Sequence, residues 1–156
     1  MEKIKLIFER GGELIVSFNG LAPNTEQRIK EILPYENILM HSRYSGREVC
    51  FGIQTKEFVK QENSHTSVNK ADVVYWCNWE TPEENGLPGS PGAEVIGLYY
   101  GEEIVQFQGK PLCVNVFGYI DESQEALLEE IGNRIWQQGF EKVRAELIDT
   151  VSNQEY

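Results

Sequence analysis

The stretch 3-KIKLIFERGGELIVSF-18 alternates apolar and polar residues on both sides of a glycine pair. Ile4, Leu6 and Phe8 fall at every second position before the glycines, and the residues after them continue the same period. Alternation of this kind is typical of a strand with one buried face, and two such runs joined by a glycine turn predict an antiparallel hairpin. The chain is therefore predicted to begin with a β-hairpin. The later segments determine the kind of sheet to which this hairpin belongs.

Further short runs rich in β-branched and aromatic residues follow along the chain. They span 38–44, 47–53, 73–79, 94–100, 104–107, 113–120 and 141–148. Two segments have helical spacing instead. The first is 22–33, which ends before Pro34, and the second runs from Asp121 or Ser123 to Gly139. Its apolar face is predicted to consist of Leu127, Leu128, Ile131, Ile135 and Trp136. The polar segment 54–70 and the Pro- and Gly-rich segment 80–93 are predicted to be loops.

This order of elements predicts a mainly β protein. About eight strands with mostly short turns and no strand–helix–strand alternation favour a closed antiparallel β-barrel, because closure removes exposed strand edges. The two helices are expected to cap its open ends. The length fits one domain, predicted to span residues 1–149, and 150–156 is predicted to be a polar tail.

The charge balance limits the partners. The chain has 25 acidic against 14 basic residues, and a net charge of -11, with no evident basic cluster. Nucleic acids and anionic membranes attract basic patches, so we expect neither as a partner. No run approaches the roughly 20 apolar residues of a membrane span, and the start is too charged for a secretory signal. We therefore predict a cytoplasmic protein.

The sequence offers no cofactor or metal motif. The three cysteines are odd in number and widely spaced, which predicts free, buried thiols and no disulfide framework. With only two histidines and no paired cysteine spacing, we expect no metal site. No glycine pattern for a dinucleotide or a phosphate follows a strand and opens a helix, so no cofactor is expected.

The segment 41-HSRYSGRE-48 is the one place where chemistry is expected. If the Met40 side of the strand is core, His41 and Arg43 share a face that looks outward or into a groove. The guanidinium donors suit a carboxylate or a carbonyl, and the imidazole titrates near neutral pH. The alternative is that Arg43 pairs with a surface acid such as Glu48 while His41 is solvated.

Asn115 is the second polar feature within a predicted strand. Three roles are open for its side chain: it is exposed on a solvated face, it forms hydrogen bonds with a buried polar group, or it donates to a ligand. Aromatic residues in 73–79 and 94–100 line a pocket or belong to the core, and the alternation places at least some of them in the core. The candidate ligand-binding residues are therefore His41, Arg43, Tyr44, Glu48 and Asn115.

The order of motifs resembles that of the cyclophilins. The matching pieces are 22-APNT-25, the strand with His41 and Arg43, and 116-VFGYI-120 before the second helix. The chain is similar, more closely, to an uncharacterised prokaryotic family of small cyclophilin-like proteins. There the matching pieces are 33-LP-34, 41-HSRYSGRE-48, 100-YG-101 and 115-NVFG-118. The resemblance implies a cyclophilin-like barrel and brings no established activity.

Prolyl isomerase activity is not expected from this resemblance. In cyclophilins the arginine strand is followed by a Phe-Met-x-Gln-Gly-Gly group that forms the proline pocket. The segment 40-MHSRYSGREVCFG-52 lacks this group, so that only Arg43 corresponds. We therefore predict a protein without catalytic activity that binds a small organic ligand or a peptide near Arg43. The alternatives are a divergent prolyl isomerase and an oligomeric accessory protein that binds partners through exposed aromatic residues of 94–107.

Overall fold

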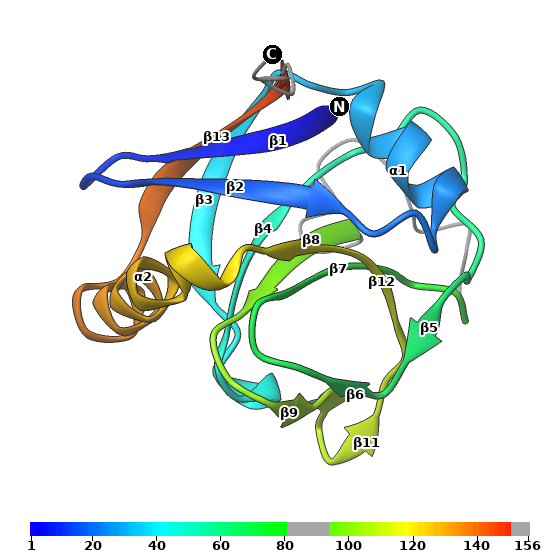
Figure 1. Ribbon diagram of the computed structural model, residues 1–156. Helices are drawn as coiled ribbons and strands as arrows, with labels where there is room; N and C mark the ends of the chain where they lie inside the picture. Colours follow the sequence, from blue (N-terminus) through cyan, green and yellow to red (C-terminus); the bar gives the residue numbers. More distant parts are fainter. Residues whose placement is uncertain (81–93, 151–156) are drawn as a thin grey trace.

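Eight antiparallel strands close into a barrel in the computed structural model, which describes residues 1–80 and 94–150 (Figure 1). The strands around the barrel are β2 (Glu13–Phe18), β1 (Glu2–Phe8), β13 (Glu141–Asp149), β3 (Tyr35–His41), β4 (Glu48–Gly52), β8 (Glu94–Tyr99), β7 (Asp72–Cys77) and β12 (Val114–Ile120). Pairing of β12 with β2 closes the ring. The predicted fold class, a mainly β closed barrel of eight strands with two helices, is confirmed.

The N-terminal hairpin shows how alternation produces the core. Its register places Ile4 opposite Val16 and Leu6 opposite Leu14. Side chains directly opposite each other in an antiparallel pair lie on the same face, so these four residues all point inward. Each is almost completely buried. The intervening residues face outward, as the two-residue period predicts.

A second apolar cluster lies outside the barrel wall. It consists of Val68, Val74, Tyr99, Val105, Val114 and Val116. It is covered by short strands that we call the outer layer, namely β6 (Ser67–Val68), β9 (Glu103–Ile104), β10 (Gln106–Phe107) and β11 (Lys110–Pro111). A further short strand, β5 (Ser64–His65), extends the sheet next to β12. The wall formed by β7, β8 and β12 is therefore buried on both faces.

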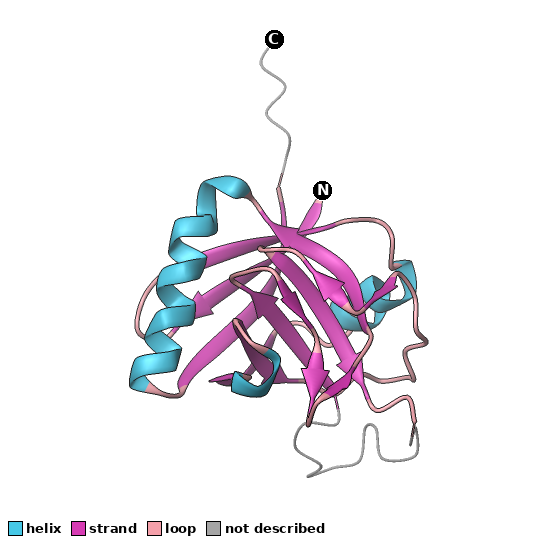
Figure 2. Cartoon of the chain, turned by 90° about the horizontal axis from the view of Figure 1, so that it is seen from below, coloured by secondary structure: helices cyan, strands magenta, loops and turns pink. Residues whose placement is uncertain are grey.

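The two α-helices lie on opposite sides of the barrel (Figure 2). Helix α1 (Pro23–Lys30) is shorter than the predicted segment 22–33, and the Glu62 carboxylate accepts hydrogen bonds at its first turn. Helix α2 (Glu125–Gln138) follows a 3-10 turn, η3 (Glu122–Gln124), and ends at Gly139 as predicted. Its residues Leu128, Ile131 and Ile135 are buried in the barrel core.

The structure also tests the predictions for the three cysteines. Cys50 and Cys77 are free and buried as predicted, whereas Cys113 is exposed, contrary to the prediction, because it precedes β12 at the rim of the outer layer. Residues 81–93 of the predicted loop and 151–156 of the predicted tail lie outside the described residues. Within the described ranges, no helix is long and apolar enough to cross a membrane.

Candidate functional site

Strand β3 ends at His41, and a 3-10 turn, η1 (Arg43–Ser45), follows it. The turn is closed by a hydrogen bond from the Ser45 amide to the Ser42 carbonyl at 3.0 Å. Gly46 ends it with φ of 93°, a conformation that L side chains rarely adopt. The predicted strand 38–44 is therefore wrong at its end, and Arg43 lies in a turn on the surface.

The predicted orientation of His41 is also wrong. Leu39 is fully buried and Met40 is exposed, so the core lies on the Leu39 side of β3. His41 shares that inner side but lies at the end of the barrel, where α2 packs. Its ring meets Trp136 edge to face at 4.7 Å and Tyr100 at 5.7 Å between centroids. His41 is therefore half-buried between the barrel wall and α2.

His41 and Tyr100 form a short polar contact. The distance between His41 Nε2 and Tyr100 Oη is 2.6 Å, while the buried His41 Nδ1 has no hydrogen-bond partner. Burial, and secondarily the charge of Arg43, lower the pKa of His41 below its ordinary value of 6.5. The imidazole is therefore neutral at pH 7, because the cationic form is disfavoured.

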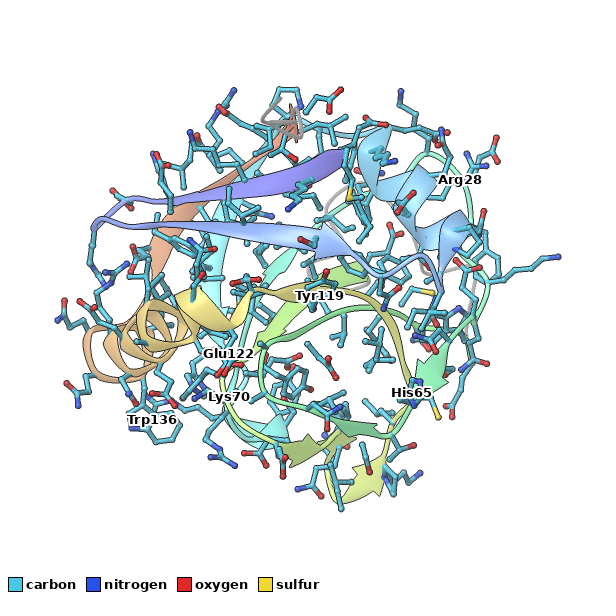
Figure 3. All side chains as sticks on the ribbon, in the orientation of Figure 1. Arg28, His65, Lys70, Tyr119, Glu122 and Trp136 are labelled. Atoms are coloured by element: carbon cyan, nitrogen blue, oxygen red, sulfur yellow. The ribbon has the colours of Figure 1, made fainter. Side chains whose placement is uncertain are left out.

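Arg43 stacks on an aromatic ring and forms no ion pair. Its Cζ lies 4.1 Å from the centroid of the Trp136 ring, and its Nη2 donates to the Trp136 carbonyl at 2.7 Å. Trp136 itself is 44% exposed and lies at the lower edge of α2 in Figure 3, although its spacing predicts a place on the apolar face. Among residues 1–80 and 94–150, no acidic side chain pairs with Arg43, so the alternative of a Glu48 ion pair is wrong.

Glu48 lies beneath the turn instead of beside Arg43. It is 7% exposed, and Ser45 Oγ donates to its Oε1 at 2.7 Å. Burial raises the pKa of Glu48. The nearby Tyr99 hydroxyl is buried without a hydrogen bond of normal geometry, and burial and the Glu48 carboxyl raise its pKa. Glu48 thus supports the turn from the inside.

Tyr44 points away from the His41 pair. Its ring packs edge to face on Phe107 of the outer layer, with 5.0 Å between centroids. Burial of part of the side chain raises the pKa of Tyr44. The turn therefore presents two adjacent residues on two sides, Arg43 toward α2 and Tyr44 toward the outer layer.

Asn115 belongs to a different place in the fold. It is fully buried in β12, and its Nδ2 donates to Thr25 Oγ1 at 3.1 Å and to the Lys60 carbonyl at 2.9 Å. Its Oδ1 accepts from the Glu62 amide at 3.0 Å. Asn115 thus connects α1, the segment before β5 and the barrel wall, and none of these contacts involves the Arg43 turn.

The structure brings His41 and Arg43 together, with Tyr100 and Trp136 as partners that the sequence did not assign to the site. We call these four residues the Arg43 cluster. Tyr100 and Trp136 were assigned mainly to core packing because of their spacing. The sequence signal that identifies them is weak: both are large aromatic residues at the very end of an apolar run.

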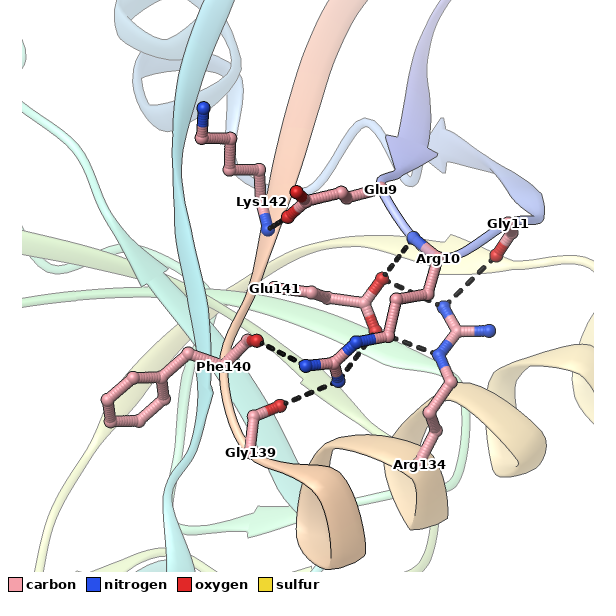
Figure 4. Close-up of polar contacts among 8 residues, drawn as sticks. All are labelled: Glu9, Arg10, Gly11, Arg134, Gly139, Phe140, Glu141 and Lys142. Carbon is pink, nitrogen blue, oxygen red and sulfur yellow. Dashed lines mark hydrogen bonds and ion pairs between the residues drawn. The ribbon is translucent and has the colours of Figure 1, made fainter.

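A buried ion pair fixes the end of α2 that carries Trp136 (Figure 4). The Glu141 carboxylate accepts from Arg134 Nε at 2.8 Å and from Arg134 Nη2 at 3.0 Å, and it also accepts from the Arg10 amide at 2.9 Å. The Arg10 side chain donates to the carbonyls of Gly139 and Phe140. These contacts, which we call the Glu141 latch, join the end of α2 to the first hairpin and to β13.

In the part of the chain that the structure describes, no group of three or more His, Cys, Asp or Glu side chains is arranged to hold a metal ion. The chemistry available at the Arg43 cluster is therefore that of a guanidinium, a neutral imidazole, a phenol and an indole. These groups suit binding of an anion or a carbonyl next to an aromatic or planar group.

Together these features define a closed eight-stranded barrel protein with a polar and aromatic surface cluster where a turn meets α2. The chain belongs to DUF3830, a family of proteins of unknown function that matches residues 10–146. No curated protein sequence matches it.

Two solved structures have a similar fold. McbB, whose structure was solved in complex with tryptophan, has a TM-score of 0.65 at 13% identity, over 98% of this chain and 46% of McbB. The chain thus spans about half the length of McbB. The hypothetical protein AF2241 from Archaeoglobus fulgidus, solved in solution, has a TM-score of 0.55 at 24% identity, over 92% of both chains. At these identities the likeness concerns the fold alone, and the cyclophilin resemblance stays a prediction.

Proposed function

We propose that the protein binds a small organic ligand at the Arg43 cluster and does not act as a prolyl isomerase. The ligand carries a carboxylate or a carbonyl for Arg43 and an aromatic or planar part for Trp136. The observation that carries the proposal is that Arg43, in a chain with 25 acidic residues, has no acidic partner among the described residues.

The stacking contact with Trp136 restricts the conformations of the Arg43 side chain before a ligand binds. A guanidinium held over an indole ring and bonded to one carbonyl has lost much of its side-chain freedom before a ligand arrives. Its remaining N–H groups keep the fixed fork that matches a carboxylate. Binding at this position therefore costs less ordering entropy than binding to a free surface arginine.

The neighbouring side chains support the same type of ligand. The exposed part of Trp136 offers an apolar surface next to the guanidinium, and the neutral His41 adds no charge that would require an additional counter-ion. Glu48 and Asn115 are buried and bonded within the protein, so we leave them out of the proposed site, and Tyr44 faces the outer layer. McbB binds tryptophan, a small molecule with a carboxylate and an aromatic ring, which makes tryptophan a sensible first probe.

The test is an NMR titration of the 15N-labelled protein with L-tryptophan, benzoate and acetate. We expect tryptophan and benzoate to shift the Arg43 Nε–H and Trp136 indole N–H signals, and acetate to act more weakly because it lacks a ring. Arg43→Ala is expected to weaken binding at least tenfold. Arg144→Ala is the matched control, because Arg144 is a partly exposed arginine on β13 with its own ion pair to Glu146. Equal loss in both variants, or no shift near Arg43 with any probe, would overturn the proposal.

The isomerase alternative is tested on the same protein with a proline-containing peptide in a protease-coupled assay. We expect no acceleration over the uncatalysed reaction, because the pocket residues that follow the arginine in cyclophilins are absent from 40–52. Acceleration that disappears in Arg43→Ala and persists in Arg144→Ala would favour a divergent prolyl isomerase instead.

A further inference from the structure

The Trp136 indole is shared by two side chains that can carry a positive charge. The Arg43 Cζ lies 4.1 Å from the centroid of the ring, and the His41 ring meets it edge to face with 4.7 Å between centroids. A guanidinium is charged at every physiological pH, whereas an imidazole gains or loses its charge near neutral pH. Because both groups contact one ring, the charge of Arg43 acts on His41 at short range.

In the absence of a ligand, His41 lacks the surroundings that would stabilise its cationic form. Among the described residues, its buried Nδ1 has no hydrogen-bond partner, and its Nε2 lies 2.6 Å from the uncharged Tyr100 hydroxyl. A hydroxyl can donate to Nε2 or accept from it, so this contact accommodates both the neutral and the cationic ring. Burial and the repulsion by Arg43 therefore decide in favour of the neutral ring.

The other charged groups packed around this end of the barrel have partners of their own. They form two ion pairs, Arg47–Glu103 and Arg134–Glu141. The first pair lies near Tyr100, and the second reaches the inner side of β3, where Glu141 stands opposite Leu39. Within residues 1–80 and 94–150, the charge that acts on the His41 imidazole is that of Arg43. A ligand that neutralises Arg43 therefore changes the electrostatic environment of His41.

We propose that the Arg43 cluster takes up its anionic ligand together with a proton from water, which His41 accepts while the ligand carboxylate balances the charge of Arg43. This inference rests on the proposed ligand site and adds its regulation by pH. The bound carboxylate offsets the repulsion that Arg43 exerts on a cationic imidazole. The net charge of the cluster is then the same before and after binding.

Proton uptake on binding fixes the direction of the pH dependence. A ligand that binds the protonated form more tightly raises the pKa of His41 from its lowered value in the free protein. The affinity therefore rises as the pH falls through the pKa of the complex, and it becomes constant below the pKa of the free protein. Above both values the ligand binds without the proton and with the lower affinity. The protein thus holds its ligand more tightly in an acidic than in a neutral medium.

The test is a benzoate titration at a series of pH values, followed by the NMR signals of the protein. We expect the affinity to rise about threefold between about pH 7.5 and about pH 5.5, a range in which carboxylates stay ionised. The imidazole signals report protonation directly. We expect saturation with benzoate to raise the pKa of His41, whereas the signals of His65, an exposed residue of β5, should not respond.

Three variants separate the coupling from general effects of pH. His41→Gln removes the titrating group, so we expect it to bind benzoate with an affinity that no longer changes with pH. His65→Gln is the matched control, because it makes the same change at the other histidine of the chain and should keep the pH dependence of the wild type. Arg43→Ala should raise the pKa of His41 without any ligand, because it removes the repulsion directly.

The outcomes distinguish the coupling from the ligand site on which it rests. Benzoate affinity that does not change with pH, equal pH dependence in the two glutamine variants, or a His41 pKa that benzoate does not raise would overturn the coupling and leave the ligand site in place. The coupling is also overturned if benzoate does not bind at any pH while tryptophan does. If none of tryptophan, benzoate and acetate binds near Arg43 at any pH, both proposals fail.

Discussion

Arg134, which lies in α2, and Arg43, which contacts α2 from the neighbouring turn, have opposite environments. Arg134 is 14% exposed and donates to a Glu141 carboxylate that is itself fully buried. Arg43 is exposed, stacks on Trp136 and donates to one carbonyl, without an acidic partner among the described residues. A guanidinium with its donors engaged inside the protein holds the structure together, whereas one with donors left over is available to a ligand. The predictions below test this contrast, from the largest expected effect to the smallest.

Removing the acid of the Glu141 latch is expected to have the largest effect. Glu141→Ala leaves the Arg134 guanidinium largely buried without a counter-ion and leaves the Arg10 amide without an acceptor. Loss of one partner of a buried pair typically costs about 3–5 kcal/mol of unfolding free energy. Urea unfolding followed by circular dichroism measures it. A loss below about 1 kcal/mol would mean that the latch contributes no more than a surface ion pair.

Gly132→Ala is expected to have an intermediate effect on stability. The added methyl group would push α2, which carries Trp136, away from Tyr100. A Cβ at position 132 of α2 would overlap the ring of Tyr100. Overpacking of this kind costs about 1–3 kcal/mol, offset slightly by the helix propensity of alanine. The ring must move, so we also expect the His41–Tyr100 contact to be lost. The His41 imidazole signals in NMR report this loss, and unchanged signals would contradict the close packing of α2 on Tyr100.

The sequence predicts the barrel well because its signals are local. Alternation in 3–18 fixes which side chains face inward, and Gly139 ends α2 where expected. The site is predicted less well because its contacts are long-range. His41 meets Tyr100, which is 59 positions away, and Arg43 meets Trp136, which is 93 positions away.

The turn that carries Arg43 was also missed, for a physical reason. Ser45 Oγ lies within hydrogen-bond distance of the Ser42 carbonyl, at 3.1 Å, and of Glu48 Oε1, at 2.7 Å, and these contacts stabilise a turn at the end of β3 in place of a longer strand. Short polar side chains of this kind offer the backbone an alternative to a sheet, and the apolar spacing of residues 38–44 does not reveal it.

Glu48→Gln tests the support beneath the Arg43 turn. The folded-state pKa of Glu48 is raised above its ordinary value of 4.5, so the folded protein binds the proton more tightly than the unfolded chain does. The stabilisation is complete below pH 4.5 and is lost as pH rises through the folded pKa, with a slope of at most about 1.4 kcal/mol per pH unit. Glutamine keeps the shape and cannot ionise. We therefore expect the variant to be less sensitive to pH than the wild type in urea unfolding above pH 5.

The control for this experiment is His41→Gln, whose expected pH dependence has the opposite sign. The pKa of His41 is lowered in the folded state, so its contribution is complete above pH 6.5 and is lost as the pH falls below that value. The unfolding free energy of the wild type should therefore fall as the pH drops below 6.5, and that of His41→Gln should fall less. Equal pH profiles for both variants would contradict the assignment of the two shifts.

Arg43→Ala is expected to have the smallest effect on stability. It removes a stacking contact worth about 0.5–1 kcal/mol at an exposed site and one hydrogen bond to a carbonyl at the end of a helix. The unfolding free energy should therefore fall by less than about 1 kcal/mol, against the far larger loss for Glu141→Ala. Arg43→Lys keeps the positive charge but lacks the planar guanidinium that stacks on Trp136. We therefore expect its ligand affinity to be little higher than that of Arg43→Ala. If Arg43→Ala instead destabilises the protein as much as the latch variant, Arg43 is a structural residue, and the contrast between the two arginines does not hold.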